Sequence, residues 1–333
     1  MPSIKDIARI AGVSHCTVSR ALHNSPLINR ETAERIREIA KRTGYVPNAV
    51  ARSLVSRSTR TVGVVVTTIA DPFNGEVVEG IESAANETSY SVILANSHAD
   101  PELEMKVVEG FSQRRVDGII VAASRVGALH AKRLAGTKVP IVLINNQSSG
   151  TFAHSVGIDN VSASAELLDY LIQLGHRRIG YIGDRFGLES DVERFTGYKN
   201  RLKHARIALD PKLVVSGDGR AEEGERAATE LLARSDPPSA IFCYNDMTAL
   251  GALRAAAARG VRVPEDLSIA GFDDLFVASY TSPPLTTIRQ PKKEMGRRAM
   301  SLLLELLDEE DVETSELLAG ELIIRGSTAR PRS

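Results

Sequence analysis

The stretch Gly12-Val13-Ser14-His15-Cys16-Thr17-Val18-Ser19-Arg20 decides how the N-terminal part of this chain folds. Glycine adopts the positive φ of a sharp turn at no steric cost, so Gly12 is expected to end a preceding helix. The Ser14 hydroxyl can cap a second helix, which is expected to run to about Leu22. The stretch therefore predicts a turn followed by a short helix with an apolar inner face and a polar outer face.

Two further helices are expected around this stretch. Ser3 and Asp6 have the spacing of a capping box, and apolar residues then recur at helical spacing up to Ala11. A third helix is expected at about 31–42, before the stop at Gly44. Two helices joined by a Gly-containing turn and supported by a third make a helix-turn-helix, whose second helix enters the DNA major groove.

The outer face of the second helix carries side chains that can read DNA. Arg20 can donate two hydrogen bonds to a guanine edge, and His15 can donate or accept. Cys16 suits either an apolar contact with a base or a packing role, and both interpretations are open. The residues of this part that are expected to contact DNA are Ser14, His15, Cys16, Thr17, Ser19 and Arg20.

The charge of the chain is divided unevenly. Residues 1–60 hold eleven Lys and Arg against four Asp and Glu, a net charge of +7. The whole chain carries −1, so residues 61–333 carry −8. A basic segment is often only a solvated surface, but here it coincides with the helix-turn-helix pattern, which favours nucleic-acid binding.

The composition is that of a water-soluble protein of two or three domains, with 333 residues, 43% hydrophobic and 25% charged. The start lacks the apolar core of a signal peptide, and no run of about 18 apolar residues occurs. The cysteines, Cys16 and Cys243, lie far apart, which predicts a reducing cytoplasm and neither disulfides nor zinc fingers. We expect no membrane association, no metal site and no cofactor.

The rest of the chain predicts an α/β body. The β-branched run Val62–Val66 is typical of a strand buried on both faces of a parallel sheet. Helices and strands then alternate with short connections, which indicates two doubly wound lobes. Helices are expected at about 75–88, 101–114, 126–135, 162–174, 191–205, 222–233, 247–259 and 292–307, and strands at about 91–95, 118–122, 141–144, 178–182, 213–215, 240–244, 267–270 and 322–324.

Ligands of open α/β sheets bind beyond the carboxyl ends of the strands, so polar residues in the following loops are candidates. Such residues also have structural explanations. Asn245 or Asp246 can cap a helix, Asp71 can start a turn, Arg194 can be a surface charge, and Asp273 can be a loop residue at a sheet edge.

The chain resembles the LacI/GalR family of bacterial transcription regulators along essentially its whole length. The segments that carry the resemblance at the N-terminus are Ile4-Lys5-Asp6-Ile7-Ala8, Thr17-Val18-Ser19-Arg20, Gly44-Tyr45-Val46-Pro47-Asn48 and Ala51-Arg52-Ser53-Leu54. The resemblance implies a hinge helix from Asn48 to about Val55, in which Asn48, Arg52 and Leu54 contact DNA. Leu54 is then either an apolar wedge in the minor groove or a linker residue packed on the body.

The resemblance also implies a two-lobed body with the fold of periplasmic sugar-binding proteins and a ligand between the lobes. Arg194 matches the family's effector-binding arginine in Arg-x-x-Gly-Tyr, Asn245 its Asn-Asp-x-x-Ala-x-Gly motif, Asp273 its Gly-Phe-Asp-Asp motif and Phe73 its ring-stacking aromatic. Asn74 stands where members often carry a second aromatic. The candidate effector-binding residues are Asp71, Phe73, Asn74, Ser190, Arg194, Asn245 and Asp273.

The resemblance sets the expected domains. These are a DNA-binding head at 1–46, a hinge and linker at 47–60, an N-terminal lobe at 61–160 with about 290–320, and a C-terminal lobe at 161–289 with about 321–330. Together these features predict a repressor that binds a palindromic operator in double-stranded DNA as a homodimer. A small polar metabolite, such as a sugar, would control it.

Enzymatic activity is not expected, because the sequence lacks G-x-G-x-x-G, G-x-x-x-x-G-K-[ST] and H-E-x-x-H motifs and offers no nucleophile–base pair. His176 is expected to be a surface or loop-capping residue rather than a base or a metal ligand. Three rival interpretations are a sugar-binding transport protein, an enzyme of sugar or nucleotide metabolism, and a DNA-binding protein whose body only dimerises.

Overall fold

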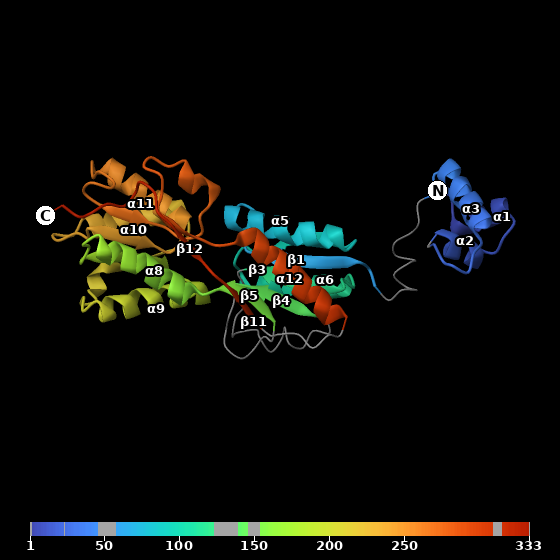
Figure 1. The fold of residues 1–333 in the computed structure, drawn as a ribbon, viewed down its shortest axis with the longest axis horizontal. Helices are drawn as coiled ribbons and strands as arrows, with labels where there is room; N and C mark the ends of the chain where they lie inside the picture. Colours follow the sequence, from blue (N-terminus) through green and yellow to red (C-terminus); the bar gives the residue numbers. More distant parts are fainter. Residues whose placement is uncertain are drawn as a thin grey trace. The chain divides into compact units, whose positions relative to one another are not determined.

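The computed structural model describes residues 2–22, 24–45, 58–122, 139–145, 154–308 and 315–332. It divides into two compact units, Met1–Thr59 and Arg60–Ser333, whose elements are labelled in Figure 1. The hinge residues Asn48, Arg52 and Leu54, and the helix expected at 126–135, lie outside the described residues.

The N-terminal unit consists of three helices, α1 (Ile4–Ala11), α2 (His15–Leu22) and α3 (Arg30–Thr43). Gly12 and Gly44 end α1 and α3 with a φ of 65° each, as expected for left-handed helix caps. Ser3 and Asp6 form the predicted capping box. Buried apolar side chains of all three helices, including Ile7, form one small core.

The N-terminal lobe of the second unit is built on a parallel sheet. Its strand order is β11 (Ser315–Leu318), β5 (Ser155–Ile158), β4 (Ile141–Ile144), β3 (Gly118–Ala122), β1 (Thr61–Val66) and β2 (Ser91–Asn96). Val64 and Val65 of β1 belong to different buried clusters on opposite faces of the sheet. One face packs on α5 (Pro72–Glu87) and α12 (Lys292–Leu307), and the other packs on α6 (Pro101–Gln113).

The C-terminal lobe has a second parallel sheet, in the order β7 (Val214–Gly217), β6 (Ile179–Asp184), β8 (Ala240–Cys243) and β9 (Ser268–Ala270). Helices α8 (Asn160–Gln173) and α9 (Glu189–His204) pack on one face, and α10 (Ala221–Leu232) and α11 (Asp246–Ala258) pack on the other. An antiparallel pair, β10 (Thr287–Arg289) and β12 (Glu321–Ile323), lies along the connections between the lobes. Short 3-10 turns occupy Pro211–Leu213 and Phe276–Ser279.

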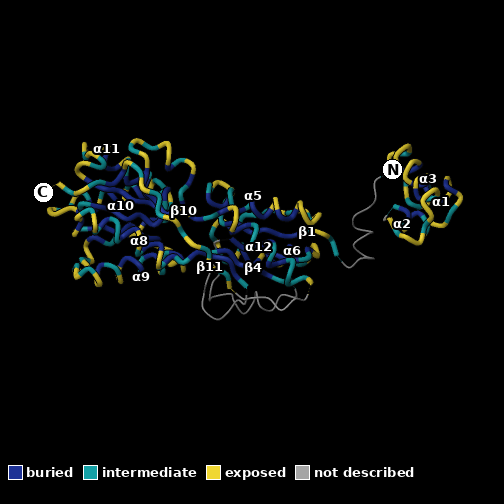
Figure 2. Tube along the Cα trace, viewed as in Figure 1, coloured by how far each residue is buried: buried dark blue, intermediate teal, exposed yellow. Residues whose placement is uncertain are grey.

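The doubly wound α/β body and the all-α head that the sequence predicts are confirmed. Figure 2 shows the central strands of both sheets buried and the helices exposed along their outer sides. The predicted strand at 213–215 is shifted, because Leu213 ends a 3-10 turn and the strand begins at Val214. Among the described residues, none of the helices is long and apolar enough to cross a bilayer.

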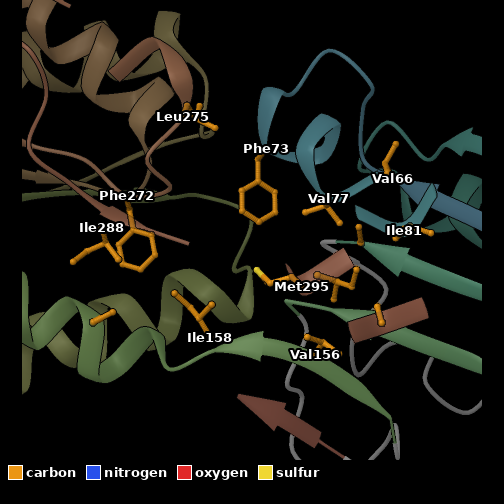
Figure 3. Close-up of a cluster of buried hydrophobic side chains, with 14 of the residues drawn as sticks. Val66, Phe73, Val77, Ile81, Val156, Ile158, Phe272, Leu275, Ile288 and Met295 are labelled. Atoms are coloured by element: carbon orange, nitrogen blue, oxygen red, sulfur yellow. The ribbon is translucent and has the colours of Figure 1, made fainter. Parts of the chain in front are cut away.

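One cluster of buried apolar side chains continues from the first lobe into the second. Figure 3 shows Phe73 between Val77 and Met295 on one side and Phe272 on the other. The two lobes therefore share a core at their junction, and the polar cleft described below lies beside that junction.

Candidate functional site

The predicted DNA-reading face of α2 is accessible. Ser14, His15, Cys16 and Arg20 are exposed, while Thr17 and Ser19 are partly buried. Ser14 Oγ accepts a hydrogen bond from the Thr17 backbone N–H at 3.1 Å, so this serine caps α2 as the sequence predicts. The remaining exposed side chains can reach a bound duplex without disturbing the core.

Arg20 differs from most basic residues around it. Arg9 pairs with Asp6 at 2.8 Å, Arg35 donates to the carbonyl of Ala11 at 2.9 Å, and Arg37 donates to Asn24 at 2.6 Å. The Arg20 side chain makes no hydrogen bond or ion pair within the part of the chain that the structure describes, although its backbone carbonyl accepts from the Ser25 N–H at 3.0 Å. Its guanidinium is thus available for a phosphate or a base edge.

The second unit contains a cleft of about 500 Å³, within the range of small-molecule sites. Its lining includes all seven predicted effector-binding residues: Asp71, Phe73, Asn74, Ser190, Arg194, Asn245 and Asp273. They come from the loop after β1, the first turn of α5, the first two turns of α9, and the loops after β8 and β9. The structure thus brings these distant segments together at the carboxyl ends of both sheets, where α/β proteins bind ligands.

Arg194 lies at the centre of a buried network and is not a surface charge. Only 2% of its surface is exposed. Its Nε donates to Asn160 Oδ1 at 2.9 Å and its Nη1 donates to the Tyr244 carbonyl at 2.6 Å. The same Nη1 lies 3.8 Å from Asp273 Oδ1, and the guanidinium lies 3.7 Å from the centre of the Phe272 ring.

Asp273 is held in an uncommon backbone conformation. Its φ is 116°, which non-glycine residues rarely adopt. The backbone is fixed there because the Asp273 N–H donates to the Ile288 carbonyl at 2.8 Å, and Lys292 Nζ donates to the Asp273 carbonyl at 2.7 Å. The side chain accepts from Gln290 Nε2 at 2.6 Å. Strain of this kind is typical of functional sites.

The Asp273 carboxyl changes its protonation state close to neutral pH. Burial raises the pKa of this carboxyl to about 7, although Arg194, Lys292 and Gln290 act to lower it and Asp71 acts to raise it. Asp71 itself caps α5 by accepting from the Phe73 N–H at 3.0 Å, and burial raises its pKa as well. The cleft therefore holds two carboxyls, one from each lobe, that bind protons more readily than exposed acids.

Asn245 has the structural role that was the alternative to ligand binding. It caps α11, because its Oδ1 accepts from the Thr248 N–H at 2.8 Å and from the Thr248 hydroxyl at 2.7 Å. Its Nδ2 donates to the Gly219 carbonyl at 3.0 Å. Asp246 is not the cap. It is fully buried and accepts from the Leu275 N–H and the Thr287 hydroxyl.

On the side of the first lobe, α5 begins three residues earlier than predicted, so Phe73 and Asn74 lie in its first turn rather than in a loop. The Phe73 ring is only 7% exposed, which leaves little of it free for stacking. Asn74 is buried and its Nδ2 donates to Thr67 Oγ1 at 3.1 Å and to the Thr68 carbonyl at 2.9 Å. Its Oδ1 has no hydrogen-bond partner among the described residues.

Ser190 and its neighbours complete the opposite wall. Ser190 Oγ lies 3.0 Å from the Tyr244 hydroxyl, and burial raises the pKa of that phenol. Leu188, just before α9, adds an apolar surface to the lining. This wall therefore combines hydroxyl groups with an aliphatic side chain.

Several lining residues were not predicted. His98, Asn145 and Asp184 follow or end strands β2, β4 and β6, so inspecting the loop after every strand would have found them. Asp218 follows β7 and could have been found in the same way. Gln290 lies on the connection between β10 and α12, and no sequence pattern marks it.

The expectation that His176 lies at the surface was wrong. The residue is 1% exposed, and its ring nitrogens lie 2.9 Å from Ser239 Oγ, 3.1 Å from Ser268 Oγ and 2.9 Å from the Ala329 carbonyl. It ties the C-terminal segment to the second sheet. The residue is buried because that segment, distant in sequence, covers it.

Comparison with known protein families gives two matches. Residues 3–48 match the family described as bacterial regulatory proteins of the lacI family, and residues 168–328 match a periplasmic binding protein-like domain. The chain is 37% identical over 327 residues to the HTH-type transcriptional repressor CytR of Escherichia coli strain K12, covering 98% of this chain and 96% of that protein. It is 34% identical over 332 residues to the HTH-type transcriptional repressor PurR of Vibrio atlanticus strain LGP32, covering 99% of each.

Solved structures agree with these matches. The lac repressor dimer bound to operator and the anti-inducer ONPF superposes with a TM-score of 0.91 at 28% identity, covering 98% of this chain and 99% of that one. A complex of the transcriptional regulator CelR with cellobiose gives a TM-score of 0.75 at 31% identity, covering 98% and 100%. These proteins are transcription regulators, as the helix-turn-helix pattern and the family resemblance predicted for this chain.

Proposed function

The chain belongs to the lacI family of bacterial regulatory proteins, and from this premise we propose that it is a repressor under small-molecule control. It binds a palindromic operator as a homodimer and responds to a polar metabolite in the cleft. One combination of features carries the proposal. A single chain joins a helix-turn-helix, in which the Arg20 side chain pairs with none of the described residues, to a two-lobed body with a buried polar cleft. A transport protein would have no use for the basic head.

In this proposal α2 enters the major groove. Ser14, Thr17 and Ser19 contact phosphates or help to position the helix, while His15, Cys16 and Arg20 face the base edges. By the family resemblance, Asn48, Arg52 and Leu54 contact the minor groove at the centre of the palindrome. A twofold dimer places its two reading helices in successive major grooves. Because the target is DNA, the protein acts in the cytoplasm.

The domain limits of the proposal follow the expected ones: a head at 1–46, a hinge and linker at 47–60, and two lobes at 61–160 with about 290–320 and at 161–289 with about 321–330. Binding of the effector draws the lobes together and moves the first lobe relative to its dimer mate. That movement changes the spacing of the two hinges and hence the affinity for the operator.

The candidate effector site is the cleft around Arg194, Asp273, Asn245, Ser190, Asp71, Phe73 and Asn74. One solved structure of the same fold, the transcriptional regulator CelR, is a complex with the sugar cellobiose. Support from this chain comes from the buried Arg194 and the strained Asp273, which one ligand could contact together. The site holds no cofactor in this proposal, and its task is binding rather than catalysis.

Selection of duplexes by the purified full-length chain, followed by fluorescence anisotropy, tests the DNA-binding part. Arg20→Ala should weaken binding to the selected duplex by roughly 1–3 kcal/mol and relax the preference at one position. Arg30→Ala is the matched control, since Arg30 is exposed on α3 and pairs with Glu34. Equal losses in both variants would show that Arg20 contributes only charge.

A further inference from the structure

Four helices line the cleft with their first turns, α5, α9, α10 and α11. A helix N-terminus normally attracts phosphate or carboxylate groups, because its free N–H groups and its dipole favour negative charge. Here each of these N-termini already carries acid or amide groups. Asp71 and Asn245 cap α5 and α11, while α9 and α10 have no side-chain cap but carry acids in their first turns. The groups concerned are the Asp71 cap of α5, Glu189 and Asp191 in α9, Glu222 and Glu223 in α10, and the Asn245 cap and Asp246 in α11.

The rest of the lining is also rich in acids. Among the described lining residues, five are aspartate or glutamate and two are arginine, with one histidine, His98. The acids are Asp71, Asp184, Asp218, Glu222 and Asp273, and the arginines are Arg194 and Arg220. Asp218 is paired with Arg185 at 3.5 Å, and burial favours the neutral form of Asp71 and Asp273. The acids still outnumber the arginines of the lining, so an anionic ligand meets repulsion from each ionised acid in a partly buried site.

Neither arginine of the lining is well placed to bind an anionic ligand. The Nε of Arg194 donates to Asn160, and its Nη1 donates to the Tyr244 carbonyl and lies near Asp273. The guanidinium also lies over the Phe272 ring. Arg220 is exposed, and Asp218 accepts a hydrogen bond from its backbone N–H at 3.1 Å. A phosphate would find no bidentate arginine fork that is free and buried in the described part of the cleft.

Two amide oxygens among the cleft-lining residues of the first lobe lack partners within the described part of the chain. Asn74 Oδ1 and Asn145 Oδ1 are buried, and neither accepts a hydrogen bond from any described residue. Their amide nitrogens are already used: Asn74 Nδ2 donates to Thr67 and Thr68, and Asn145 Nδ2 donates to Gln290 Oε1 at 3.3 Å. Each amide is therefore oriented so that an acceptor remains, and buried acceptors without partners are rare in folded proteins.

From this arrangement we infer that the effector is an uncharged or cationic molecule rich in hydrogen-bond donors, such as a free sugar, an amino sugar or a nucleoside. Phosphate esters and carboxylates of the same molecules are excluded. Hydroxyl or N–H groups of the ligand satisfy Asn74 and Asn145, and the acids of the second lobe accept from its other donors. The inference rests on the proposed function, since it names the class of molecule that the same cleft takes.

A screen of matched pairs tests the inference with the full-length chain. Each pair is an uncharged or cationic compound and its phosphate ester or acid: pentoses, hexoses, amino sugars and nucleosides against their phosphates, and hexoses against uronic acids. Thermal unfolding finds ligands, because a ligand of the native state raises the melting temperature, and calorimetry ranks them. We expect at least one uncharged or cationic compound to bind, with its anionic partner weaker by about tenfold or more.

Two results would overturn the inference. One is an anionic compound that binds as tightly as its uncharged partner or more tightly. The other is a screen in which no uncharged or cationic compound binds. Measuring operator affinity together with ligand affinity separates this inference from the proposed function. An anionic compound that binds and alters operator affinity would contradict the inference but not the proposed function. Compounds that bind the cleft without altering operator affinity would contradict the proposed function.

Variants locate the ligand within the cleft. Asn145→Ala and Asn74→Ala should each weaken the compound found in the screen by about tenfold, because each removes one acceptor. Asn96→Ala is the control, since Asn96 Oδ1 is also buried without a partner but does not line the cleft. Asp71→Asn keeps a helix cap and removes one charge, so discrimination against the anionic partner should fall about tenfold. Unchanged discrimination in Asp71→Asn, or equal losses in Asn96→Ala, would contradict the assignment.

Discussion

Replacing Arg194 by methionine tests the buried charge around which the cleft is built. Methionine keeps the unbranched aliphatic stem of the side chain but removes the guanidinium, which lies over Phe272 and donates to Asn160 Oδ1 and the Tyr244 carbonyl. A buried acceptor left unsatisfied costs about 1–3 kcal/mol, and removing one partner of a buried ion pair costs about 3–5 kcal/mol. These losses overlap because one guanidinium contacts all three partners. We therefore expect the free energy of unfolding to fall by about 4 kcal/mol near pH 8.

The loss should depend on pH in a defined direction. Burial raises the pKa of Asp273 to about 7 in the folded chain, above the value of about 4 for an unfolded aspartate. The folded state therefore binds this proton more tightly, and its stability falls as the pH rises from about 4 through 7. Without Arg194 the pKa of Asp273 rises further. The part of the stability loss that comes from the Asp273 charge should therefore vanish near about pH 5, where this carboxyl is neutral in both proteins, and grow above about pH 7.

Urea unfolding followed by tyrosine fluorescence measures this loss, since the chain has no tryptophan and six of its seven tyrosines follow residue 60. Protein concentration is held fixed because a dimer's stability depends on it. Arg194→Met combined with Asp273→Asn removes both charges and should recover about 2 kcal/mol near pH 8. A single variant that loses under about 1 kcal/mol at every pH, or a double variant no more stable than the single, would refute the reasoning.

His176→Gln should cost about 1–3 kcal/mol above about pH 7, because the histidine holds Ser239, Ser268 and Ala329. Burial lowers the pKa of His176, so the wild type loses stability as the pH falls below about 6.5 and the gap to the variant should narrow; a gap independent of pH would argue against a buried neutral ring. Gly251→Ala should destabilise by about 3 kcal/mol in urea unfolding, because a Cβ there meets the backbone of Ala221 and Glu225. Gly75→Ala, where nothing lies within 4 Å, should instead stabilise by about 0.5–1 kcal/mol; a loss there would mean that the two sites do not differ in packing. Leu54→Ala should weaken operator affinity at unchanged melting temperature, and equal affinity for the operator would exclude a wedge.

The elements of the body could be predicted because each carries its own local signal. The β-branched run Val62–Val66 marks a buried strand, and Lys292–Leu307 has a helical period and forms the helix expected there. Strands β10, β11 and β12 are short, and β11 is an edge strand that is partly exposed. Long-range pairing, rather than a local pattern, stabilises them, so the sequence predicted β12 with a shift and missed β10 and β11. The buried strand β5 of the first sheet was also missed.

The site was predictable to the extent that strand ends locate it. The loops after β1, β8 and β9 led to Asp71, Asn245 and Asp273, and all three line the cleft. The burial of Arg194 was not predictable, because its partners come from α8, the loop after β8 and the loop after β9. The same holds for the unpartnered oxygen of Asn145, whose amide is oriented by a residue 145 positions away.

The central claim is that a small molecule bound in the cleft controls the affinity of the N-terminal helix-turn-helix unit for DNA. The most direct measurement is the affinity of the full-length chain for its selected palindrome, by anisotropy at moderate ionic strength, with and without the compound found in the matched-pair screen. We expect the palindrome to be preferred over random duplex by about a thousandfold or more, and the compound to change its affinity at least about tenfold in the wild type but not in Arg194→Met. Equal binding to palindromic and random duplexes, or an operator affinity that no cleft ligand alters, would contradict the account.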